Sequence, residues 1–183
     1  MIYFLLADGF EEIEALAPVD FLRRVGLSVT TVGMKGNLVC GAHGISVKAD
    51  CAFDDCDFSD GEMIVLPGGM PGTTHLDEDS RLDDLLSSVY GRGGVLAAIC
   101  AAPMILGKRG YLQGKSAICY PGFESYLQGA EISSFPVVAD GRILTAKSAG
   151  VAWEFAYRIA QYFVGTSRCE AVREALFLPP FGE

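Results

Sequence analysis

The feature that most constrains the fold is an alternation of short apolar runs with segments of helical periodicity along the whole chain. Residues 2–7 and 94–99 are uninterrupted apolar runs of the length and composition of buried strands. Between them, residues 11–25 and 80–90 place apolar side chains at helical spacing. Strands that alternate with helices predict a parallel sheet covered on both faces, which also explains why the strands carry few polar residues.

Further elements follow the same scheme. Strands are expected at 27–32 and 63–66, a hairpin at 37–47, and a last helix at 151–163. More strands are expected at 116–119, 135–138 and 143–145, the last two joined by a turn at Asp140-Gly141. We therefore predict an α/β fold with a doubly wound, mostly parallel sheet sandwiched by helices, as a single domain over residues 1–183. In such sheets ligands bind at the carboxyl ends of the strands.

Charge and hydropathy exclude several classes of protein. The chain has 23 acidic against 14 basic side chains and a net charge of −9, whereas nucleic-acid binding needs clustered Lys and Arg. Nucleic acid is therefore not expected as the main partner. The apolar start lacks a basic region and continues into Asp8, so we interpret it as a first strand and not a signal peptide. With no apolar run long enough to cross a bilayer, we expect no membrane association and a cytoplasmic location.

Cysteine side chains can bind metal ions or form disulfides. Six are present, none as a C-x-x-C pair, and the chain has two histidines. The spacing of Cys51 and Cys56 does not fit a zinc knuckle. We expect free thiols and no metal site.

Cys100 stands where the apolar strand 94–99 meets the helix-like segment that begins at Ala101-Ala102-Pro103. Free backbone N–H groups and the helix dipole at such a junction favour a thiolate, so a low pKa is expected. Small neighbours permit the tight strand-to-helix turn called a nucleophile elbow. The alternative is a buried structural cysteine, since free cysteine is often buried.

A thiolate nucleophile needs a proton-handling partner and backbone donors for an oxyanion. Glu14 lies one turn into the first helix among apolar neighbours, which would raise its pKa and allow it to donate a proton. It is expected to share a helix face with Glu11, while Glu12 points elsewhere. Gly68 and Gly69 end the strand 63–66 and allow close approach of a ligand, although a plain turn explains them as well.

Several segments together resemble the ThiJ/PfpI superfamily, in the branch that contains DJ-one and YajL. They are Phe10-Glu11-Glu12-Ile13-Glu14, Pro18-Val19-Asp20, Val65-Leu66-Pro67-Gly68-Gly69, Ala97-Ala98-Ile99-Cys100-Ala101-Ala102-Pro103 and Tyr120-Pro121-Gly122-Phe123-Glu124. The resemblance implies a flavodoxin-like fold, related to that of class I glutamine amidotransferases. It also implies a homodimer. The sequence contains no metal or cofactor motif, so no cofactor is expected.

The resemblance also implies roles for individual residues. Cys100 would be the low-pKa nucleophile and Glu14 the acid hydrogen-bonded to it. Gly69 and Ala101 would supply N–H groups to the oxyanion, with Gly68 beside them. Tyr120 stands where many relatives carry a histidine near the cysteine, so it is a candidate third residue of the site, and no Cys–His pair is expected at this position.

Other positions where this chain differs from the family pattern exclude some activities found in the family. His43 lies where relatives often carry an arginine near the partner subunit's site, and both it and His75 are interpreted as surface residues. Protease-type relatives place histidine directly after the cysteine, where this chain has Ala101, so a protease is not expected. An amidotransferase would need a His-x-Glu pair downstream of Cys100. The segment 147–150 replaces a Gly-Pro-Gly-type turn and is expected to have no effect on the cleft.

Three functions remain open. The first is cysteine-dependent, cofactor-free processing of reactive dicarbonyls such as methylglyoxal, as a glutathione-independent glyoxalase (glyoxalase III, a lyase) or a deglycase (a hydrolase). Its partners would be small aldehydes, dicarbonyls or glycated proteins. The second is an oxidative-stress sensor or chaperone in which Cys100 is oxidised to a sulfinate. The third is an interaction module without catalysis.

Overall fold

A seven-stranded sheet forms the centre of the molecule in a computed structural model, which describes residues 1–182. The strand order is β10-β11-β7-β6-β1-β2-β5, and every neighbouring pair is parallel except β10 and β11. The strands are β1 (Ile2–Leu6), β2 (Val29–Gly33), β5 (Cys51–Ala52), β6 (Met63–Leu66), β7 (Val95–Ile99), β10 (Val137–Asp140) and β11 (Ile143–Ala146).

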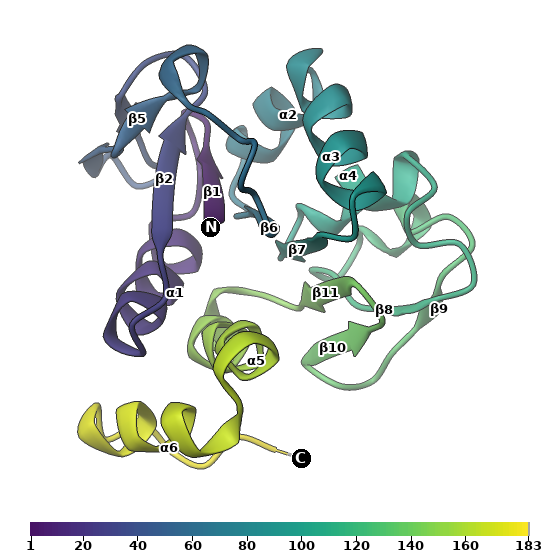
Figure 1. The fold of residues 1–183 in the computed structure, drawn as a ribbon. Coiled ribbons are helices and arrows are strands. Elements are labelled where there is room, and N and C mark those ends of the chain that lie inside the picture. Colours follow the sequence, from purple (N-terminus) through teal and green to yellow (C-terminus); the bar gives the residue numbers. More distant parts are fainter. Residues whose placement is uncertain (183) are drawn as a thin grey trace.

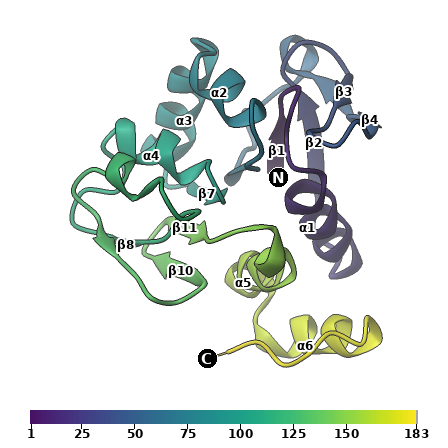
Figure 2. The same ribbon diagram turned by 180° about the vertical axis from the view of Figure 1, so that it is seen from behind.

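Helices cover both faces of this sheet (Figures 1 and 2). One side holds α1 (Glu12–Arg24), α5 (Ala152–Val164) and α6 (Thr166–Ala175). The opposite side holds α2 (Gly72–Asp77), α3 (Arg81–Gly91) and α4 (Pro103–Lys108). The predicted doubly wound, mostly parallel α/β fold is confirmed.

The alternation of side chains along the strands builds two hydrophobic cores. In β1, Ile2, Phe4 and Leu6 pack into the cluster that contains α1 and α5 residues. Tyr3 and Leu5 point the other way, into the cluster that contains α3 and α4 residues. Both faces of β1 are therefore buried, which explains why its sequence is continuously apolar.

Shorter elements lie at the edges. The predicted hairpin is formed by β3 (Leu38–Cys40) and β4 (Ser46–Lys48), which pair antiparallel beside β2. A second small sheet pairs β8 (Ser116–Ala117) with β9 (Glu131–Ile132). The predicted turn at Asp140-Gly141 joins β10 to β11, with Gly141 at φ +62°. Strands β5 and β9 and helices α2 and α6 were not predicted.

No helix within residues 1–182 combines the length and the apolar character needed to cross a membrane. The parallel strands β1, β6 and β7 are neighbours and run in the same direction, so their carboxyl ends meet at one edge of the sheet. The segments that follow these three strands carry Glu14, Gly68-Gly69 and Cys100. The fold therefore brings the three predicted pieces together.

Candidate active site

Cys100 occupies a strained turn directly after β7. Its φ is +65°, in the left-handed region that a residue with a side chain rarely adopts. The turn is fixed by backbone hydrogen bonds: Cys100 N–H donates to the Ala146 carbonyl at 2.9 Å, and Tyr120 N–H donates to the Cys100 carbonyl at 2.8 Å. Helix α4 begins three residues later with Pro103 at its first turn. This is the geometry of a nucleophile elbow, with the cysteine side chain half-buried.

Two backbone N–H groups interact with the Cys100 sulfur. They belong to Gly69 and Ala101, and both act to lower the pKa of the thiol. Gly69 adopts φ +89°, and a side chain there would collide with the backbone of Glu11 at 2.3 Å. Gly69 is therefore required for the loop that presents its N–H group. The structure thus places both predicted oxyanion donors beside Cys100.

Glu14 lies in the first half of α1 and is fully buried. Its Oε2 accepts a hydrogen bond from Gly68 N–H at 2.9 Å, while Oε1 has no hydrogen-bond partner within residues 1–182. Burial raises the pKa of Glu14 to about 7, although the Cys100 thiol and the Gly68 and Ala149 N–H groups act in the opposite direction. The direction of this shift is the one expected from the apolar neighbours of Glu14 in the sequence.

The contact from Ala149 corrects one expectation. The segment 147–150 is expected to have no effect on the cleft, yet the Ala149 backbone is near enough to Glu14 to lower the pKa of its carboxyl, without a hydrogen bond to Oε1. Ala149 lies after β11, more than a hundred residues from Glu14 in the chain. No local sequence signal could have identified a backbone donor at that distance.

The predicted low pKa of Cys100 is wrong for the free protein. Burial raises the pKa of the thiol to about 12, and the charge of Glu14 adds to the rise. The N–H groups of Ala101 and Gly69 oppose this effect without reversing it. The sequence argument included the helix dipole but not desolvation or a carboxylate from α1. At neutral pH Cys100 is therefore a thiol, and Glu14 beside it is the group that can accept the thiol proton.

Glu12 contacts His43 and not the Cys100 site, in agreement with the prediction that it points away from Glu14. Glu12 is buried, and its Oε2 lies 2.9 Å from His43 Nδ1 while Oε1 accepts from His43 N–H at 2.9 Å. Glu11 also approaches the His43 ring, at 3.6 Å. Burial of Glu12 raises its pKa, but the His43 ring and backbone N–H groups lower it further, below its usual range. Glu11 and Glu12 thus share His43, and only Glu14 serves the Cys100 site.

The remaining candidate residues lie at the margin. The Tyr120 side chain is 47% exposed, and its hydrogen bond to Cys100 is made by its backbone. His43 is exposed, as expected for a surface residue, and its pKa is raised by Glu12 and Glu11. His75 is half-buried, with Nδ1 2.7 Å from the Asp8 carbonyl oxygen. No histidine pairs with Cys100 within residues 1–182.

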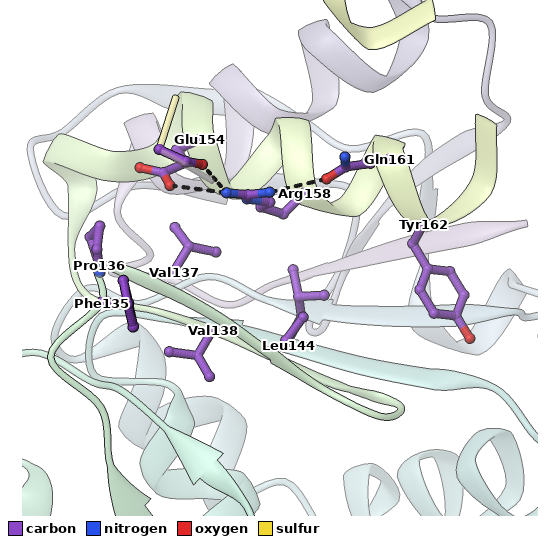
Figure 3. A pocket seen from close by; sticks show the side chains of 11 residues that line it. Phe135, Pro136, Val137, Val138, Leu144, Glu154, Arg158, Gln161 and Tyr162 are labelled. Atoms are coloured by element: carbon purple, nitrogen blue, oxygen red, sulfur yellow. Dashed lines mark hydrogen bonds and ion pairs between the residues drawn. The ribbon is translucent and has the colours of Figure 1, made fainter. Parts of the chain in front are cut away.

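A cluster of possible metal ligands and a cavity lie within residues 1–182, and neither includes Cys100. Glu11, Glu12 and His43 have ligand atoms within 4.8 Å of one another, but Cys100 is not among them. A cavity of about 550 Å³ lies between β10, β11 and α5 (Figure 3). Val137, Val138 and Leu144 line one wall, and Glu154 and Arg158 line the other. This cavity contains none of the predicted site residues.

The fold and the site together define a class: α/β proteins with a cysteine on a nucleophile elbow, a buried glutamate beside it and backbone N–H donors at the sulfur. Residues 1–162 match the sequence model of the DJ-1/PfpI family. The chain belongs to the DJ-1/PfpI family.

Individual relatives agree with this assignment. The chain is 35% identical to protein dj-1beta of Drosophila melanogaster over 177 residues. This alignment covers 95% of each of the two chains. The crystal structure of Drosophila melanogaster DJ-1beta superposes with a TM-score of 0.92 at 34% identity, covering 98% of both chains. A protein of Pyrococcus horikoshii named deglycase is 31% identical over 149 residues, which is 80% of this chain and 89% of that protein.

Proposed function

We propose that this protein processes reactive dicarbonyls or early glycation adducts by covalent catalysis at Cys100, without a cofactor. The observation that carries the proposal is the pair formed by Cys100 and the buried Glu14, with the N–H groups of Gly69 and Ala101 at the sulfur. The similarity to a protein named deglycase supports the substrate class. A single cytoplasmic domain over residues 1–183 that forms a homodimer is part of the same proposal.

The first step is addition of the thiol to the aldehyde of methylglyoxal. The Cys100 sulfur bonds to the aldehyde carbon, and the thiol proton passes to the Glu14 carboxylate. The carbonyl oxygen becomes an oxyanion, which the Gly69 and Ala101 N–H groups stabilise. Protonation of the oxyanion by Glu14 gives a hemithioacetal. Glu14 is suited to this exchange because its pKa of about 7 lets it accept and return a proton at neutral pH.

The second step moves hydrogen between the two carbons. Glu14 removes the proton from the carbon bonded to sulfur, and the neighbouring carbonyl carbon receives a proton, so the hemithioacetal becomes a thioester of lactate. Water then cleaves the thioester and releases lactate with the Cys100 thiol. The overall reaction adds one water to methylglyoxal and requires no external oxidant or reductant. Oε1 of Glu14, which has no protein partner within residues 1–182, is available for these transfers.

The test is lactate formation from methylglyoxal without glutathione. The comparison is wild type against Cys100→Ser and Glu14→Gln, with Cys40→Ser as control because Cys40 is exposed on β3. Both site variants should lose at least a hundredfold in kcat/KM, while Cys40→Ser retains it. Turnover at the wild-type rate in Cys100→Ser would refute the proposal. The same four proteins should be assayed on a glycated peptide to separate deglycase from glyoxalase activity.

An oxidative-stress sensor or chaperone is the second candidate. The N–H groups of Gly69 and Ala101 would also stabilise the charge of a Cys100 sulfinate, and a protonated Glu14 could donate to its oxygen. Peroxide titration followed by intact mass measurement should then show a gain of two oxygens that Cys100→Ser lacks. A wild type inert toward methylglyoxal but selectively oxidised at Cys100 would favour this function over catalysis.

Exposed apolar side chains support the expected homodimer. Ile13 on α1 is 53% exposed, Leu38 on β3 is 70% exposed, and Ile45 in the hairpin is 55% exposed. Ile13 follows Glu12 in the chain, and Ile45 N–H donates to Glu12 Oε1 at 3.4 Å, so both residues lie beside the Glu12–His43 contact that joins the hairpin to α1. Burial in a partner would remove their apolar area from water. Analytical ultracentrifugation of wild type and Ile13→Asp tests the assembly.

A further inference from the structure

A second pair of cysteines lies apart from the Cys100 site. Cys51 in β5 and Cys56, which follows the 3-10 turn Phe53–Asp55, have their sulfur atoms 2.8 Å apart. Both side chains are half-buried, and both are free thiols. The sulfur atoms are therefore in direct contact, whereas most thiol pairs would need backbone movement to meet.

This pair is remote from Cys100. Strand β5 lies at one edge of the main sheet, four strand positions from β7. Neighbouring strands are about 4.8 Å apart, so the two sites are separated by roughly 19 Å across the sheet. Chemistry at Cys51 and Cys56 therefore does not involve the Cys100–Glu14 pair directly.

The loop that carries Cys56 is held in place by contacts from other elements. The Tyr3 hydroxyl lies 2.6 Å from the Asp57 carbonyl oxygen and 2.6 Å from Asp60 Oδ1. The Arg81 guanidinium stacks over the Phe53 ring at 4.4 Å. These contacts fix the turn between the two cysteines, so the approach of the sulfur atoms is organised before any reaction.

We propose that Cys51 and Cys56 form a reversible intrachain disulfide, a redox site separate from Cys100, with hydrogen peroxide as the oxidant. Peroxide oxidises the Cys51 sulfur to a sulfenic acid and leaves as one water. The Cys56 sulfur then attacks the Cys51 sulfur, the S–O bond breaks, and the hydroxyl departs with the Cys56 proton as a second water. Two thiols and one peroxide thus give one disulfide and two waters.

The surroundings explain the order of the steps and the type of oxidant. Burial, the neighbouring Cys51 and the charges of Asp57 and Asp60 raise the pKa of Cys56 to about 12. Cys56 therefore keeps its proton and acts second. Asp57 and Asp60 place negative charge near Cys56 and repel anionic oxidants such as oxidised glutathione. A neutral hydroperoxide has no such barrier.

The test uses folded wild-type protein treated with hydrogen peroxide, blocked with N-ethylmaleimide and digested with trypsin. Residues 49–81, between the cleavage sites at Lys48 and Arg81, contain Cys51 and Cys56 as their only cysteines. We expect this peptide to lose two hydrogens and to carry no alkyl group, and dithiothreitol treatment before blocking to restore both alkylation sites. Cys100→Ser should give the same result.

Matched variants locate the bond. Cys56→Ser should leave residue 51 as a sulfenic acid or a more oxidised form, whereas Cys40→Ser should form the peptide disulfide as wild type does. Full alkylation of both cysteines in wild type after prolonged peroxide treatment would overturn the proposal. So would a disulfide that links two chains, or one that dithiothreitol cannot reduce. These readouts on wild type do not depend on whether any variant folds.

Discussion

A side chain at Gly68 would place its Cβ 2.6 Å from the Cβ of Cys100. The same position lies 2.6 Å from Oε2 of Glu14. Only the backbone of Gly68 therefore lies between Cys100 and Glu14, and its N–H group donates to the Glu14 carboxylate at 2.9 Å. The approach of Cys100 to Glu14 depends on the absence of a side chain between them.

Gly68→Ala should therefore abolish activity. The added methyl group must displace Cys100, Glu14 or the β6 terminus, and we expect kcat/KM to fall by at least a hundredfold and the free energy of unfolding to fall by about 1–3 kcal/mol. Gly91→Ala is the matched control, because nothing lies within 4 Å of its Cβ position. Methylglyoxal kinetics and urea unfolding check both variants. Wild-type kinetics in Gly68→Ala would show that the contact is not critical.

Most of the fold could be predicted because its main strands are buried on both faces. In β1, β6 and β7 every residue is buried, so the sequence carries uninterrupted apolar runs that local reasoning recognises. Strand β5 has two residues and was missed. Helix α6 was missed because one of its ten residues, Cys169, is buried, which leaves little amphipathic pattern.

The residues of the site could be predicted from the sequence, but the pKa of Cys100 could not. Cys100, Glu14, Gly68 and Gly69 follow strands whose ends meet, so topology alone places them together. The pKa of Cys100 depends on how deeply the thiol is buried and on a carboxylate from another segment. Both are properties of the tertiary structure, which residue type and spacing do not encode. The Ala149 donor was missed for the same reason.

Activity should rise with pH through the pKa of Glu14. The carboxylate form accepts the thiol proton, and burial raises its pKa to about 7. We expect kcat/KM to increase about tenfold per pH unit below this value and to level off above it. Measurement of methylglyoxal turnover from pH 5 to 9 checks this. A profile that is flat across this range would instead indicate a preformed thiolate at Cys100.

Glu14 should destabilise the folded protein at alkaline pH. Its pKa rises from 4.5 to about 7 on folding, so the folded state binds more protons between these values and stability falls as pH rises through them. Glu14→Gln removes this titration. Its stability relative to wild type should increase by up to about 3 kcal/mol between pH 4 and pH 8.

Urea unfolding at several pH values measures this difference. Glu131→Gln is the control, because Glu131 is exposed on β9 and should show no comparable change. A constant difference between Glu14→Gln and wild type across the range would mean that Glu14 is not protonated preferentially in the fold.

Ala149 is expected to position the charge of Glu14 through its N–H group. Ser148 has extended backbone angles and Ala149 begins a 3-10 turn, a place where proline is tolerated. Ala149→Pro removes this N–H group, so the pKa of Glu14 and the rise in activity with pH should both shift upward. Circular dichroism checks that Ala149→Pro folds. Ala139→Pro is not a suitable control, because proline at this position would disrupt strand β10. A folded variant with an unshifted profile would show that Ala149 has no such role.

The strained backbone conformation of Cys100 should lower the free energy of unfolding by a measurable amount. At φ +65° a Cβ atom is unfavourable, so Cys100→Gly should be more stable than Cys100→Ala by about 1 kcal/mol. Both variants lose the thiol, so the comparison isolates the backbone from the chemistry, and neither should turn over methylglyoxal.

Cys119 is the matched control because its φ is not positive. There the order should reverse, with alanine more stable than glycine by about 0.5–1 kcal/mol. Equal stability of the two variants at position 100 would mean that the turn relaxes around the side chain, and the elbow would then hold the sulfur without stored strain.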